Sequence, residues 1–202
     1  MLTFFSGRIR ISPFALLLLI IIAFSPDAPL FYLALAFAAL HEIGHILAMK
    51  RLGARVDCLS IYPFGADIRA DLSHLSYRAE ILCTLAGPLV SLSAALLFLL
   101  LLPHFRNVYI LSSAVSNFLF FAVNILPVRG LDGSRVLLAF LLSKLEYPLA
   151  YKIFDIISTA SFALLCFLSL CLIVASGYNL SLVFICIYLF MSEFVKVRSC
   201  FA

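Results

Sequence analysis

Residues 30–51 read LFYLALAFAALHEIGHILAMKR and carry the pentapeptide HEIGH at positions 41–45 inside an apolar run. The run is long enough for a membrane-spanning helix, which needs about 20 mostly apolar residues. On a helix, His41 and His45 lie one turn apart on the same face, so both imidazoles can bind one metal ion. Glu42 lies on the adjacent edge and can act as a general base on water near that metal. The stretch predicts a metal site within a membrane helix.

The energetics of the membrane favour a metal ligand role for these side chains. An ionised group at the centre of a spanning helix costs roughly 2.5–3.5 kcal/mol, whereas a structural zinc site contributes about 10–16 kcal/mol. A bound metal would offset the cost of placing His41, Glu42 and His45 there. The alternative is a histidine pair that is hydrogen-bonded to neighbouring helices and binds no metal.

The composition indicates an all-α polytopic membrane protein. Of the 202 residues, 65% are apolar and 12% are charged, and the mean hydropathy is +1.18. About six spanning helices fit in this length, within a single integral-membrane domain over residues 1–202 whose core covers about residues 30–145. The net charge of +4 belongs to the loops, so we expect no nucleic-acid partner. The six cysteines contain no C-x-x-C pair, which argues against a thiol metal site.

Six apolar segments are predicted to be spanning helices. The first is short and also resembles a signal peptide, although Pro26 directly after Ser25 disfavours cleavage there. The fifth and sixth lie within about residues 153–197. The six predicted segments are Ile11–Phe24, Leu30–Arg51, Ala79–Leu102, Val108 to about Leu126, Ser158–Ala175 and Leu180–Val195.

Between the second and third helices, the sequence predicts a small β-hairpin. Residues 59–62 and 66–71 alternate with a period of two around Pro63-Phe64-Gly65. Because an open sheet edge cannot face lipid, the hairpin must lie at the membrane interface or against the helices. Its free edge could accept an extended peptide by strand addition. An interfacial loop without a substrate role is the alternative.

Small and polar residues on the third and fourth helices predict close packing around the histidines. Small residues at helical spacing allow neighbouring helices to approach, and buried amides require partners. The third helix carries such a stripe at Thr84, Gly87, Ser91 and Ala95, and the fourth has Ser113, Asn117 and Asn124 on one side.

The second unusual stretch is NILPVRGLDG at residues 124–133, where proline and glycine break the helix. It presents Asp132 on irregular backbone at the membrane edge. A catalytic zinc usually has three protein ligands, and a carboxylate is a common third, so Asp132 is the candidate beside His41 and His45. The alternative is that Asp132 caps the helix predicted for residues 133–144.

The charge distribution predicts the topology. If the N-terminus is cytoplasmic, only Arg106 of the 14 lysine and arginine residues falls outside, which is a strong positive-inside bias. The second and fourth helices then run in the same direction. His41, His45 and Asp132 would lie near the cytoplasmic side, and both termini would be cytoplasmic.

With these motifs in place, the chain resembles the site-2 proteases, intramembrane zinc metalloproteases of peptidase family M50, and within them the short type similar to sporulation factor IVFB. The resemblance covers about residues 30–136. The motifs that carry it are HEIGH at 41–45, Pro63-Phe64-Gly65, Ala86-Gly87-Pro88, and Asn124-x-x-Pro127 leading to Leu131-Asp132-Gly133.

The resemblance implies a zinc endopeptidase with one Zn²⁺ per chain, bound by His41, His45 and Asp132. Glu42 would activate water, Asn124 would hold the substrate strand or polarise its carbonyl, and Pro127 and Gly133 would help to position the substrate. The implied activity is intramembrane proteolysis of a membrane-associated protein. A metal-ion permease or an inactive membrane-binding relative are the alternatives.

Three positions depart from the pattern of that family. Gly130 stands where a second proline is often found, Ser91 where asparagine is common, and Ser134 where a second glycine often follows the aspartate. These departures concern substrate alignment more than the metal ligands. By the same resemblance we expect a multi-pass protein of the bacterial cell membrane. Its role would be regulated proteolysis of a signalling or transcription-factor precursor, and its partners the lipid bilayer and regulatory membrane proteins.

Overall fold

The computed structural model describes residues 2–4, 9–26, 28–62, 65–72, 74–105 and 107–176. The chain forms two compact units, Met1–Asn124 and Ile125–Ala202. Each unit has its own helices and its own packed side chains. The predicted sixth helix, residues 180–195, lies outside the described residues, and the single domain over residues 1–202 stays a prediction.

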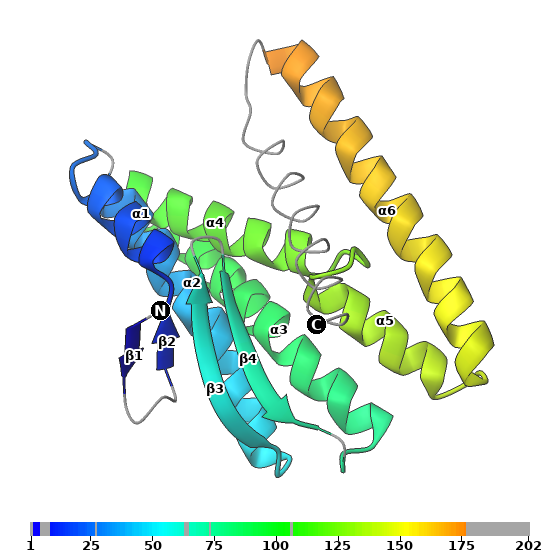
Figure 1. Cartoon of the computed structure of the whole chain (residues 1–202). Coiled ribbons are helices and arrows are strands. Elements are labelled where there is room, and N and C mark those ends of the chain that lie inside the picture. Colours follow the sequence, from blue (N-terminus) through cyan, green and yellow to red (C-terminus); the bar gives the residue numbers. More distant parts are fainter. Residues whose placement is uncertain are drawn as a thin grey trace. The chain divides into compact units, whose positions relative to one another are not determined.

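Three helices form the centre of the first unit (Figure 1): α2 (Ala28–Arg51), α3 (Tyr77–Leu101) and α4 (Val108–Asn124). Their bounds confirm the predicted second, third and fourth helices to within a few residues. Helix α2 ends where Gly53 takes a φ of 86°, a left-handed conformation that glycine adopts without steric cost. Ser76 caps α3, because its hydroxyl oxygen accepts a hydrogen bond from the backbone N–H of Ala79.

The predicted first spanning helix is wrong in length. Helix α1 covers Pro13–Ala23, only 11 residues, and Ile11 belongs to a strand instead. A helix of this length rises about 16 Å, whereas the hydrocarbon core of a bilayer is about 30 Å thick. The apolar run misled the prediction because a short strand of Ile and Arg residues leads directly into it.

The hairpin is confirmed and belongs to a larger sheet. Strands β3 (Arg55–Tyr62) and β4 (Gly65–Asp71) pair antiparallel, with a register shift at Val56–Cys58. On its other side β3 pairs in parallel with β2 (Ile9–Ile11), which pairs with β1 (Leu2–Phe4), so the order is β1-β2-β3-β4. The two N-terminal strands of three residues each carry too little periodicity to be predicted.

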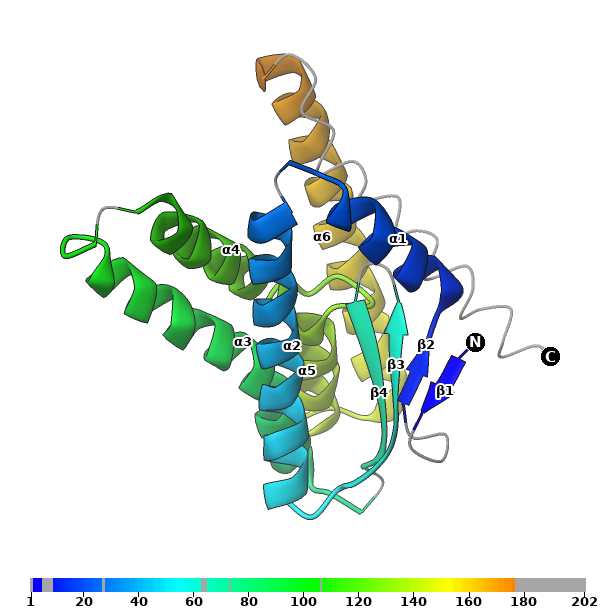
Figure 2. The same ribbon diagram turned by 90° about the vertical axis from the view of Figure 1, so that its left-hand side faces the viewer.

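The sheet packs on the end of α2 that follows the histidines (Figure 2). Met49, Ala54 and Cys83 form a buried cluster there, which side chains of both β3 and β4 cover, among them Val56 and Ile68. This cluster connects α2, α3 and the sheet. It therefore fixes the axial position of α2, the helix that carries the HEIGH motif.

The second unit contains α5 (Asp132–Leu142) and α6 (Tyr147–Ser176), which run antiparallel (Figure 1). Leu141, Ala150 and Phe154 form the core between them. Helix α5 confirms the helix predicted for residues 133–144. Helix α6 contains the predicted fifth helix, residues 158–175, and begins 11 residues before it.

Among the described residues, three helices are long and apolar enough to cross a membrane: Ala28–Arg51, Tyr77–Leu101 and Tyr147–Cys171. Helix α4 is a shorter apolar helix of 17 residues. Large apolar side chains on these helices are exposed, for example Leu47, Leu97 and Leu164. An apolar outer surface with small and polar residues inside is the arrangement expected in lipid. It supports the all-α membrane class that the composition predicted.

Candidate metal centre

His41 and His45 lie on the inner face of α2, and their imidazoles meet. Each residue is only 5% exposed. The Nε2 atoms of the two rings are 3.2 Å apart, and the ring planes cross at 77°. Two nitrogens that bind one tetrahedral zinc ion at about 2.0–2.1 Å lie about 3.3–3.4 Å apart. The spacing of the two Nε2 atoms therefore fits a shared metal ion.

Helix α3 holds the opposite nitrogen of each ring. The Nδ1 atom of His45 is 2.9 Å from the backbone oxygen of Cys83, and Nδ1 of His41 is 3.0 Å from the hydroxyl oxygen of Ser91. A carbonyl oxygen can only accept, so Nδ1 of His45 carries the hydrogen and its Nε2 presents a lone pair. Metal-binding histidines commonly donate their second N–H in this way. The donor set thus suits a divalent metal.

The His45 ring packs directly against the backbone of Gly87 on α3. A Cβ atom at position 87 would lie within 2.7 Å of the ring carbons Cδ2 and Cε1 and would overlap Nε2. Gly44 of α2 is similarly close to α3, since a Cβ there would lie 2.9 Å from Val90 Cγ2 and 3.1 Å from the oxygen of Ala86. The absence of two side chains lets the helices approach and leaves room for the imidazole.

The predicted small-residue stripe on α3 is confirmed, and two of its members have a role that the spacing alone did not reveal. All four of its residues, Thr84, Gly87, Ser91 and Ala95, are buried. The spacing of the stripe predicts helix packing, and in the structure Gly87 and Ser91 also contact the histidine rings. The carbonyl of Cys83 was also missed, because a backbone acceptor leaves no mark in a sequence. To identify these α3 residues from the sequence, one would need to know which of them face the HEIGH motif across the contact between α2 and α3.

Glu42 follows His41 on α2 and is half-buried. On α4, Ser113 and Asn117 are buried, and Nδ2 of Asn117 donates to the oxygen of Ser113 at 2.9 Å. Asn124 is half-buried at the end of the same helix, where its Nδ2 donates to the oxygen of Phe120 at 3.0 Å. The expectation of a polar inner side of α4 is therefore confirmed for Ser113 and Asn117, and the substrate role of Asn124 stays a prediction.

Asp132 opens α5 in the second unit and is not the capping residue of that helix. The N-cap is Leu131, whose backbone is extended and whose side chain makes no capping hydrogen bond. Asp132 is half-buried in the first turn, a position where the helix dipole favours a negative charge. The alternative of a helix cap is therefore wrong. Its assignment as the third metal ligand remains a prediction from the sequence.

The loop before Asp132 has a defined backbone. Gly130 has a φ of 91°, which proline cannot adopt because its ring fixes φ near about −65°. Ser134 is buried and donates its hydroxyl to the oxygen of Leu131 at 2.7 Å. Two departures from the family pattern, Gly130 and Ser134, thus have structural reasons.

Gly133 is closely packed against the backbone before the loop. A Cβ at Gly133 would lie 2.6 Å from the oxygen of Leu126 and would overlap the Ile125 carbonyl. Packing therefore explains a glycine here, whereas the substrate roles of Gly133 and of the half-buried Pro127 stay predictions.

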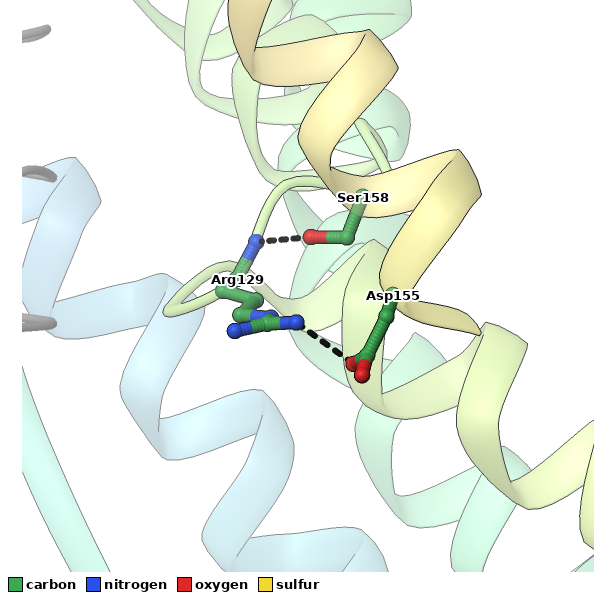
Figure 3. Close-up of polar contacts among 3 residues, drawn as sticks. All are labelled: Arg129, Asp155 and Ser158. Atoms are coloured by element: carbon green, nitrogen blue, oxygen red, sulfur yellow. Dashed lines mark hydrogen bonds and ion pairs between the residues drawn. The ribbon is translucent and has the colours of Figure 1, made fainter. Parts of the chain in front are cut away.

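Helix α6 holds this loop through Arg129, three residues before Asp132 (Figure 3). The backbone N–H of Arg129 donates to the hydroxyl of Ser158 at 3.0 Å, and its guanidinium forms an ion pair with Asp155. The guanidinium also lies over the ring of Phe154, 5.6 Å from its centroid. Next to Arg129, Val128 is 2% exposed and packs on Leu165. Contacts of four kinds therefore fix the loop that ends at Asp132.

These contacts predict an order of effects. We expect Ser158→Ala to lower the free energy of unfolding by about 1–3 kcal/mol, since it removes the hydroxyl that accepts from the Arg129 N–H. Asp155→Ala should cost only about 0.2–1 kcal/mol, because both members of that ion pair are partly exposed. Unfolding of the two variants in detergent would measure the difference. A larger loss for Asp155→Ala would contradict the order.

The comparisons with known proteins agree with this geometry. The profile of the family described as peptidase family M50 matches residues 30–115, which include all of α2 but its first two residues and the whole of α3. A zinc metalloprotease of Methanocaldococcus jannaschii is 30% identical over 131 residues, which are 62% of this chain and 38% of that protein. The chain thus spans less than half the length of this curated relative. The fold resembles that of a site-2 protease from the same organism, with a TM-score of 0.68 and 22% identity over 91% of this chain and 87% of the other.

Proposed function

We infer that this chain is a zinc metalloprotease of peptidase family M50 that hydrolyses a peptide bond in or near the membrane segment of a membrane-associated protein. The observation that carries the inference is the pair of buried imidazoles on α2, whose Nε2 atoms are 3.2 Å apart. A carboxylate stands next to them in the sequence, at Glu42. The helix that bears all three is apolar and long enough to cross a membrane.

His41, His45 and Asp132 would hold one zinc ion in this chain. Zinc, when bound, supplies Lewis-acid polarisation of a carbonyl and makes water more acidic. The two histidines suit it because their Nδ1 atoms are engaged by α3, so both Nε2 atoms can offer lone pairs. Asp132 would add a negative oxygen ligand, and three protein ligands leave one position open for the reaction.

Glu42 would move the proton of the reaction. Its carboxylate accepts a proton from the attacking water while the oxygen of that water bonds to the scissile carbonyl carbon. The same proton then passes to the amide nitrogen as the carbon–nitrogen bond breaks. The products are a carboxylate and an amine. No other group is consumed, so Glu42 returns to its starting state.

The substrate must present an extended backbone, since the carbonyls of a helix are already hydrogen-bonded. Asn124 would hold the substrate strand or polarise its carbonyl, and Pro127 and Gly133 would shape the loop beside it. Strand β4 is one of the two edge strands of the sheet in the described part of the chain, and its outer side could pair with a strand of substrate.

The cellular setting follows from the charge distribution and the family. We propose a multi-pass protein of a bacterial cell membrane, with both termini and the metal centre toward the cytoplasm. Its substrate would be a membrane-anchored precursor of a signalling protein or transcription factor. Regulatory membrane proteins would control its access.

Bound zinc tests the ligand set. We expect the purified full chain in detergent to contain zinc, and Asp132→Ala to lose most of it, because two histidines alone leave the ion one protein ligand short. Glu146→Ala is the matched control, since Glu146 is an exposed carboxylate just after the same helix. Elemental analysis and titration against a chelator would measure both. Equal zinc affinity in Asp132→Ala and the wild type would remove Asp132 from the ligand set.

A further inference from the structure

We infer that Ser91 is a positioning residue for His41: its hydroxyl holds that imidazole in the orientation for metal binding and can bond to either of its tautomers. The inference rests on the proposed function, because a bound metal is what gives the orientation its importance. Ser91 is on α3 and His41 on α2, 50 residues apart in the chain, and Nδ1 of His41 is 3.0 Å from Oγ of Ser91. Ser91 is 1% exposed.

Because both partners are buried, the loss of this hydrogen bond would be costly in free energy. A hydroxyl and a ring nitrogen that are removed from water lose free energy if they have no partner, so each requires one inside the protein. Two other serines bond to their own helix: Ser93 of α3 donates to the oxygen of Leu89, and Ser113 of α4 donates to the oxygen of Tyr109. The Ser91 side chain instead meets a ring on another helix. It is therefore placed for the histidine and not for its own backbone.

The two groups of α3 that contact the histidine Nδ1 atoms differ in what they can do. The carbonyl of Cys83 accepts only, so it admits His45 in one tautomer. The hydroxyl of Ser91 can both donate and accept, so it can bond to Nδ1 of His41 with or without a hydrogen there. Metal binding requires the lone pair at Nε2 of His41 and hence the hydrogen at Nδ1, which Ser91 then accepts.

The difference between the Ser91 hydroxyl and the Cys83 carbonyl determines how the His41 ring can respond to a metal. When Nε2 of His41 carries the hydrogen, it can donate to the lone pair of Nε2 in His45 at 3.2 Å, while Ser91 donates to Nδ1. With a metal bound to both Nε2 atoms, the hydrogen of His41 would be on Nδ1 and not on Nε2, the Ser91 hydroxyl would accept it, and the ring would keep its place. Ser91 thus allows His41 to exchange a hydrogen bond for a metal bond without rotating.

The experiment measures metal binding by the full chain in detergent. Ser91→Ala is expected to weaken zinc affinity about 10–100-fold, the usual effect of removing a group that orients a metal-binding histidine. Ser93→Ala is the matched control, because it removes an exposed hydroxyl from the same helix without touching a histidine, and its affinity should equal that of the wild type. Ser91→Thr keeps a hydroxyl and should recover most of the affinity. The visible absorption of the Co²⁺-loaded protein should change in Ser91→Ala and not in Ser93→Ala.

The outcomes separate this inference from the proposed function. A wild-type chain that binds no zinc would overturn both. A wild-type chain that binds zinc, together with a Ser91→Ala variant of equal affinity and an unchanged Co²⁺ spectrum, would overturn the role of Ser91 alone. Thermal unfolding without added metal checks that Ser91→Ala is folded. If that variant were unfolded and Ser91→Thr bound zinc as weakly as a His41→Ala variant, a purely structural role would replace the one proposed.

Discussion

Replacing Glu42 with glutamine is expected to lower the rate of substrate cleavage by about 10²–10⁴-fold and to leave the zinc content at the wild-type level. General acid–base catalysis contributes a factor of this size, and an amide of nearly the same shape cannot take up the proton of water. His41 and His45 keep their contacts with α3 in this variant, so the metal should stay. Loss of activity with retained zinc would identify Glu42 as the proton carrier.

The measurement compares cells that express the wild-type chain with cells that express Glu42→Gln. Quantitative proteomics should find membrane-anchored precursors that accumulate in the variant, and each such precursor is a candidate substrate. Glu80→Gln is the matched control, because Glu80 is half-buried at the start of α3 and should leave the pattern unchanged. Continued processing of the same precursors in Glu42→Gln would contradict the assigned role.

Gly87→Ala should have the second large effect, a loss of zinc affinity. The added methyl group would overlap the His45 ring, which lies between α2 and α3 and is tied to the Cys83 carbonyl. The ring can escape only by breaking that hydrogen bond and moving Nε2 away from His41. We expect zinc affinity to fall by at least the 10–100-fold seen when an orienting contact is lost. The helix itself has no reason to unfold, since alanine is a better helix former than glycine.

Gly44→Ala separates the loss of the metal centre from a general disturbance of helix packing. Its methyl group would press on Val90 and on the oxygen of Ala86, across the same contact between α2 and α3. Comparable stability of the two variants in detergent, with zinc lost only in Gly87→Ala, is the expected result. Unchanged zinc affinity in Gly87→Ala would show that the ring has space to move without leaving the metal.

The sequence predicted the helices well where hydropathy and length act together. Residues 28–51, 77–101 and 108–124 are apolar runs that end near a glycine, a proline or a charged residue. In lipid such runs form helices, because a helix satisfies all backbone hydrogen bonds within the segment. The N-terminal strands were not predictable, because Ile9–Ile11 is strand only through its pairing with Leu59–Ile61 of β3. A pairing between segments 50 residues apart depends on tertiary structure and not on local pattern.

The metal centre was predictable only in part. His41 and His45 are one turn apart on one helix, so a local motif suffices to bring them together. Ser91 and Gly87 reach them across a helix–helix contact, and their small side chains look the same in a sequence whether they serve packing or a ring. The loop before Asp132 required the φ of Gly130 and the contacts of Arg129 with α6, neither of which leaves a periodic signal.

The contacts between α2 and α3 also have a consequence for biogenesis. Both histidines and the groups that hold their Nδ1 atoms lie within residues 41–91. Chains are synthesised from the N-terminus at about 5–20 residues per second, so this half of the centre can assemble while residue 132 is still unmade. The carboxylate that would complete the ligand set arrives later. A nascent chain can therefore insert and pair its two histidines before the proposed third ligand has been synthesised.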